Sequence, residues 1–144
     1  MCSGSHHRVH RSDARDLDSQ LRPVARFVLT GQAGYYVVTG LWPILHMGSF
    51  EAITGPKVDD WLVKMVGLLA ATIGVALGVA VRNHRWNAEI RALAILSALS
   101  FAAIDLRYAL SGRISPIYLA DAVVELGIIA LLGGTILLAR GRTA

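Results

Sequence analysis

Apolar residues in this chain are gathered into four long blocks instead of being spread with the period of an amphipathic helix or strand. Each block is at least as long as the roughly 20 residues that a helix needs to cross a hydrocarbon core about 30 Å thick. The blocks cover about residues 24–46, 60–81, 87–111 and 116–139. The pattern therefore predicts an all-α fold, an integral membrane four-helix bundle in which each block is one span.

The first 22 residues are polar and lack an apolar core, so we expect no cleavable signal peptide there. We interpret residues 1–22 as a cytoplasmic tail, flexible or lying on the surface, and residues 23–144 as the membrane domain. Pro23 fits the first turn of a helix, where its missing N–H is not needed. His6 and His10 would share a helical face, but no carboxylate or cysteine completes a metal set, so we expect no metal.

The connections between the blocks carry turn and cap signals. Residues 48–60 form the longest connection and contain the turn dipeptide Gly55-Pro56, and Asp59 is a candidate N-cap for the second span. A basic turn covers residues 82–86, and Asn87 can cap the third span. Residues 112–116 turn the chain into the fourth span.

The distribution of basic residues predicts the orientation. Five Lys or Arg residues lie up to Arg26, three lie around the second connection, and two lie at the C-terminal end, against four on the opposite side. Because loops rich in Lys and Arg stay in the cytoplasm, we expect both termini there.

Composition agrees with a membrane protein: 54% of the residues are hydrophobic and 17% are charged, against roughly 25% charged in soluble domains. The formal charge of +4 does not indicate a nucleic-acid partner, because the bases lie between and outside the apolar blocks and lack interleaved aromatic residues. Cys2 is the only cysteine, which excludes an intrachain disulfide.

Small residues in the second block predict close helix packing. Gly74 and Gly78 form a GxxxG pair, and Gly67 extends the small surface. The third block is rich in alanine and serine. We expect these faces to pack within the bundle or against a second copy or another membrane protein, with the lipid bilayer around them.

Charged and phenolic side chains interrupt the apolar blocks at what we expect to be the outer side of the membrane. Asp121 and Glu125 are four residues apart and share one helical face. Asp105 and Lys64 would reach a similar depth on other spans. The candidate polar cluster consists of Lys64, Asp105, Arg107, Tyr108, Tyr118, Asp121 and Glu125.

Three interpretations of this cluster are open. It is a structural set of ion pairs that fixes helix register, or a polar pocket whose acids bind a cation, a proton or a polar headgroup, or a surface where one acid meets a partner protein. In the ion-pair interpretation Lys64 or Arg107 neutralises Glu125. Replacing Glu125 by leucine would then destabilise the protein, and less than additively with changes at Lys64 or Arg107.

Catalytic and cofactor signals are lacking. The chain has no GxSxG, HExxH or phosphate-binding glycine loop. His46 and His84 fall at opposite membrane faces, which disfavours a bis-histidine haem. We therefore expect no cofactor and lean against an enzyme. The first hypothesis is an accessory or scaffold subunit of a membrane complex; the alternative is a small transporter or ligand-binding protein that uses the pocket around Glu125, Asp121, Asp105 and Lys64.

The chain resembles the DoxX-like group of small four-helix bacterial membrane proteins between about Ala25 and Ala139. The resemblance rests on span order and length, on Ala25-Arg26 at the entry to the first span, on the glycine-rich start of the second span, and on the turn from Gly112 to Pro116 followed by Glu125. It implies a multi-pass protein of the bacterial inner membrane and no particular reaction.

Overall fold

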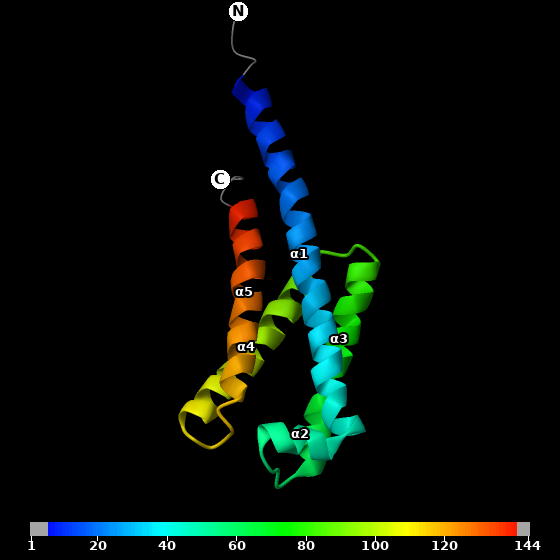
Figure 1. Cartoon of the computed structure of the whole chain (residues 1–144). Helices are drawn as coiled ribbons and strands as arrows, with labels where there is room; N and C mark the ends of the chain where they lie inside the picture. The colour runs from blue at the N-terminus through cyan, green and yellow to red at the C-terminus, as the bar shows by residue number, and fades with distance from the viewer. Residues whose placement is uncertain (1–5, 141–144) are drawn as a thin grey trace, which may run out of the picture.

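The computed structural model describes residues 6–140, with side chains described from Arg22 to Leu138. Cys2, His6 and His10, considered above for chemistry, lie outside the described side chains. The elements in this range are all helical (Figure 1), which confirms the all-α class. They are α1 (His6–Leu45), α2 (Met47–Thr54), α3 (Asp60–Arg82), α4 (Ala88–Leu110) and α5 (Tyr118–Arg140).

The last three helices begin and end within about two residues of the predicted blocks. Asn87 caps α4 as expected, because its side-chain oxygen accepts a hydrogen bond of 3.1 Å from the backbone N–H of Ile90. Asp59 precedes α3 but makes no side-chain cap. Gly112, with a φ of 69°, turns the chain between α4 and α5. Local signals therefore set most of these helix ends.

Helix α1 begins earlier than the first span was expected to begin. It starts at His6 and runs through Pro23 and Pro43 to Leu45, so the placement of Pro23 in the first turn was wrong. Residues 6–22, expected to form a flexible or surface-lying tail, continue the same helix. The unpredicted helix α2 follows directly in the long connection.

Among the described residues, three helical segments are long and apolar enough to cross a membrane: α3, α4 and residues 118–138 of α5. The chain is thus a multi-pass membrane protein by length and composition. Helix α1 is not among them, because Gln32, Tyr35 and Tyr36 interrupt its apolar block. Gln32 and Tyr36 are buried inside the protein, so these polar groups do not meet lipid. A fourth span in α1 stays a prediction.

The long helices form two packed pairs. Helix α1 runs along α3, α4 packs on α5, and contact between α1 and α5 joins the pairs, whereas α3 touches α4 only slightly. Figure 1 shows the ends of α1 and α5 that lead to the termini at the same end of the molecule as the turn between α3 and α4. Helix α2 and the turn between α4 and α5 lie at the other end.

Glycines allow α1 and α3 to touch through their backbones. A methyl group on Gly67 would overlap the carbonyl oxygen of Gly40, and one on Gly74 would lie 2.7 Å from the carbonyl oxygen of Ala33. Gly78 is different, since a methyl group there would meet only the Cβ of Ala33 at 3.9 Å. Gly67 and Gly74 thus pack against α1 of the same chain, while the position of Gly78 has room for a methyl group.

The apolar core occupies the half of the bundle nearer the termini. Its centre contains Leu29, Leu77 and Leu132, each fully buried, packed on the small residues Ala94 and Ala98. The buried polar side chains Gln32, Asp105 and Glu125 lie outside this cluster. The buried acidic and amide side chains therefore lie toward the half of the bundle beside α2.

We expect Gly67→Ala to lower the melting temperature of the detergent-purified protein, because the new methyl group forces α1 and α3 apart. Overpacking of this kind costs about 1–3 kcal/mol. Gly78→Ala is the matched control and should change the melting temperature little, because its methyl group makes only an ordinary van der Waals contact with the Cβ of Ala33. Equal effects of the two substitutions would contradict the close contact at Gly67.

Candidate functional site

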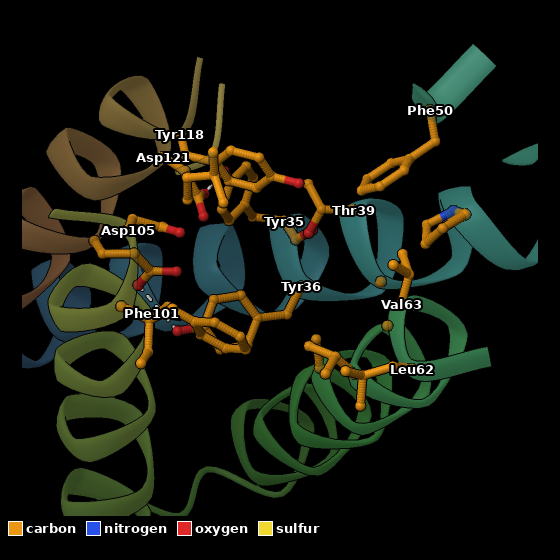
Figure 2. Close-up of a pocket in the computed structure, with 18 of the residues that line it drawn as sticks. Tyr35, Tyr36, Thr39, Phe50, Leu62, Val63, Phe101, Asp105, Tyr118 and Asp121 are labelled. Carbon is orange, nitrogen blue, oxygen red and sulfur yellow. Dashed lines mark hydrogen bonds between the residues drawn. The ribbon is translucent and has the colours of Figure 1, made fainter. Parts of the chain in front are cut away.

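A pocket of about 440 Å³ opens between the two helix pairs at the α2 end of the bundle. Figure 2 shows Asp105 and Asp121 at one end of it, Phe50, Leu62 and Val63 at the other, and Tyr36 between them. All five helices contribute side chains to its wall. The pocket thus has one acidic end and one apolar end.

Three carboxyl groups from two helices form the acidic end. Asp121 and Glu125 come from one face of α5, as their spacing predicted, and Asp105 comes from α4. The carboxyl of Asp105 lies next to that of Asp121 and within electrostatic range of Glu125. Asp105 is 6% exposed and Glu125 is 1% exposed. The acids are therefore held close together and largely away from solvent.

Tyrosines of α1 supply the hydrogen bonds to these acids. Tyr36 Oη donates to Glu125 Oε2 at 2.9 Å, and Tyr35 Oη donates to Asp121 Oδ1. Behind them, Gln32 Nε2 donates to Tyr36 Oη at 3.3 Å and to the carbonyl oxygen of Ala94 at 2.9 Å. A chain of polar groups thus links α1 to both α4 and α5.

The tyrosines were not in the predicted cluster, although their spacing in the sequence indicates their position. Gln32, Tyr35, Tyr36 and Thr39 follow the spacing i, i+3, i+4, i+7, which places them on one face of a helix. A polar stripe in an otherwise apolar block has to face protein or a cavity. The stripe faces α4, α5 and the pocket.

One carboxylate oxygen in the pocket has no partner. Asp105 Oδ2 is buried and makes no hydrogen bond within the described part of the chain, and the same is true of Gln32 Oε1. Buried polar atoms are nearly always hydrogen-bonded, and a buried carboxylate normally has a counter-charge. Asp105 therefore has the strongest unmet requirement for a positively charged or proton-donating group.

The predicted counter-charges are not in the cluster. Lys64 and Arg107 are both exposed and do not line the pocket, and neither pairs with the acids in the described range, so the ion-pair interpretation was wrong. Asp105 and Arg107 are about 200° apart on α4, so burial of the first directs the second outward. On α3, Val63 and Gly67 occupy the pocket side and Lys64 lies off it.

Of the two tyrosines in the predicted cluster, one lines the pocket and the other does not. Tyr118 lines the pocket, while Tyr108 is 39% exposed and does not. Of the predicted cluster, the residues that come together in the pocket are Asp105, Tyr118, Asp121 and Glu125.

A lysine outside the predicted cluster does reach the pocket. The ammonium group of Lys57 lies 5.1 Å from the ring centre of Tyr118 and 5.8 Å from that of Phe50, and it donates to the carbonyl oxygen of Thr54 at 3.0 Å. It makes no ion pair with the three acids. The aromatic rings hold this cation by the attraction of their faces for positive charge.

Helix α2 is fixed to the end of α1 beside the pocket. Trp42 Nε1 donates to Ser49 Oγ at 2.8 Å, and the rings of Trp42 and Phe50 meet edge to face with centres 5.6 Å apart. The backbone N–H of Lys57 donates to Glu51 Oε1 at 2.8 Å. These bonds place Phe50 and Lys57 against the pocket.

Chemically, the pocket suits a ligand with an apolar part and a positive charge. No group of three His, Cys, Asp or Glu side chains in the described range is arranged to hold a metal ion.

Comparison with models of known protein families, with curated proteins and with solved structures gave no match.

We expect Tyr36→Phe to destabilise the protein by about 1–3 kcal/mol, because it leaves the buried Glu125 without its donor and removes an acceptor from Gln32. Thermal unfolding in detergent measures the change. Tyr108→Phe removes an exposed hydroxyl and serves as the control. A Tyr36 variant as stable as the Tyr108 variant would show that this hydrogen bond does not stabilise the fold.

A double-mutant cycle distinguishes the observed partner of Glu125 from the one that was predicted. Because Tyr36 touches Glu125, the effects of Tyr36→Phe and Glu125→Gln on unfolding free energy should differ from additivity by more than about 0.5 kcal/mol. Arg107→Gln and Glu125→Gln should be additive within that value. Coupling to Arg107 instead of Tyr36 would restore the ion-pair interpretation.

Proposed function

We propose that the chain is a four-span protein of the bacterial inner membrane, with both termini in the cytoplasm, that binds a small organic cation with an apolar body in the pocket described above. The binding is non-catalytic and serves as the recognition step of a small transporter or receptor. The four-span bundle and the DoxX-like resemblance belong to this proposal.

Three features support the topology. Three helices of the described part of the chain are apolar enough to cross a membrane. The described ends of α1 and α5 lie at the same end of the molecule (Figure 1), as a protein with an even number of spans requires. The segments at that end carry most of the Lys and Arg residues of the sequence, which favours a cytoplasmic location for that end.

The observation that carries the proposal is the unpartnered carboxylate oxygen of Asp105 in a pocket that already contains Asp121 and Glu125. Ionisable groups within a membrane span are costly and usually meet a counter-charge. Lys64 and Arg107 lie outside the pocket, and Lys57, which lines it, forms no ion pair with these acids, so within the described residues no basic side chain pairs with them. A ligand with a positive charge supplies it.

The rest of the wall favours an organic cation. A volume of about 440 Å³ is within the range of pockets that take small organic ligands. The ring of Phe101 meets that of Tyr36 edge to face with centres 5.3 Å apart, so aromatic surface borders the acidic end. The alkylammonium of Lys57 lies over the rings of Tyr118 and Phe50, which supports recognition of such a group by aromatic side chains of this pocket.

An accessory or scaffold role was suggested by the small-residue face of the second span. Gly67 and Gly74 of that face are occupied by α1 of the same chain. The pocket has no part in that role, so the geometry favours ligand binding.

Binding of benzyltrimethylammonium to the full-length protein in mild detergent tests the proposal by calorimetry or thermal shift. Neopentylbenzene is its neutral isostere, with carbon in place of nitrogen. We expect the cation to bind and to lose about 10-fold or more in affinity in Asp105→Asn and Glu125→Gln, because charge-assisted contacts are worth about 1.5–3 kcal/mol.

Glu89→Gln is the control, since Glu89 is exposed in the first turn of α4, far from the pocket. It should leave affinity unchanged. Equal binding of the neutral isostere, or equal loss in the Glu89 variant, would contradict recognition of positive charge by the pocket acids.

A further inference from the structure

A second cleft lies at the opposite end of the bundle, beside the turn between α3 and α4. It has a volume of about 40 Å³ and is lined by basic side chains from two separate elements. Arg22 and Arg26 come from α1, and His84 and Arg85 come from the turn. No carboxylate lines it among the described residues. Basic side chains thus gather around this cleft, which is separate from the acidic pocket described above.

The floor of this cleft is apolar. Leu29 is 1% exposed, and Val81 and Trp86 are partly buried beside it. The guanidinium of Arg91 lies 5.8 Å from the ring centre of Trp86 and covers part of the indole. Tryptophan is the residue that typically marks the level of lipid headgroups. The cleft therefore combines a basic rim with an apolar base.

The turn that presents Arg85 has an unusual backbone. His84 has a φ of 54°, a left-handed conformation that non-glycine residues rarely adopt. Its N–H donates to the carbonyl oxygen of Val81 at 3.1 Å, and that of Arg85 donates to the carbonyl oxygen of Ala80 at 2.9 Å. These bonds end α3 tightly and bring Arg85 back over the last turn of the helix, toward Arg26.

We propose that this cleft binds the phosphate of an anionic phospholipid headgroup. Arg26 and Arg85, both exposed and from different elements, hold the phosphate oxygens, and the first acyl carbons lie against Val81 and Trp86. Arginine suits phosphate because its planar fork donates two parallel hydrogen bonds. Basic pockets between spans on the cytoplasmic side are typical sites of anionic headgroups.

The apolar floor distinguishes a lipid from a free anion. A soluble phosphate would gain nothing from Val81 and Trp86, which are partly exposed, whereas a lipid buries its upper chain against them. A general excess of Lys and Arg on the cytoplasmic side does not require basic residues from different elements to line one cleft. Here arginines of α1 and of the turn between α3 and α4 do so. The site is independent of the cation pocket, so either proposal can fail alone.

The test uses the purified full chain in neutral detergent, with lipid binding measured by native mass spectrometry. The probes are dioleoylphosphatidylglycerol, dioleoylphosphatidylcholine and inorganic phosphate. We expect the anionic lipid to bind preferentially. The double variant Arg26→Gln, Arg85→Gln should lose about 25-fold in affinity for it, since one basic residue near a lipid surface contributes about fivefold.

Two further variants make the result specific. Arg107→Gln with Arg113→Gln removes the same charge from exposed residues elsewhere and should leave the preference intact. Arg26→Lys with Arg85→Lys keeps the charge and should retain preference for the anionic lipid. Loss in the Arg107 and Arg113 variant equal to that in the Arg26 and Arg85 variant, equal binding of the two lipids, or equally tight binding of inorganic phosphate would overturn the proposal.

Discussion

The hydrogen bond from Tyr36 to Glu125 is the contact on which the polar half of the molecule depends. It joins α1, which is packed on α3, to α5, which is packed on α4. Glu125 is 1% exposed, and the hydroxyl of Tyr36 satisfies part of its hydrogen-bonding capacity. The two helix pairs are thus joined by a hydrogen bond to a buried acid of the pocket.

The division of the bundle into two halves follows from this arrangement. Toward the termini, leucines and alanines fill the interior. Toward α2, the pairs leave a pocket of about 440 Å³, where bulky aromatic and acidic residues replace the close-packed core. The filled half and the close backbone contact between Gly40 and Gly67 both hold the helices together, while the half beside α2 keeps the pocket.

The sequence predicted the helical class, the ends of α3, α4 and α5, and the shared face of Asp121 and Glu125, because span length, caps and helical period are local properties. It did not predict that Lys64 and Arg107 point outward, since equal depth in a membrane does not fix the direction of a side chain around its helix. The role of Lys57 depends on α2, whose fold in the connection has no strong local signal. Tyr35 and Tyr36 follow the spacing of one helical face in the sequence, but they were not included in the predicted cluster.

The central claim is that the pocket holds a positive charge between its acids. A crystal structure with benzyltrimethylarsonium, whose arsenic scatters anomalously, tests it directly. We predict one strong arsenic peak within contact distance of the carboxyl groups of Asp105 and Glu125, with the benzyl ring toward Val63. An arsenic peak on the outer surface of the helices, or none in the pocket at saturating concentration, would contradict the account.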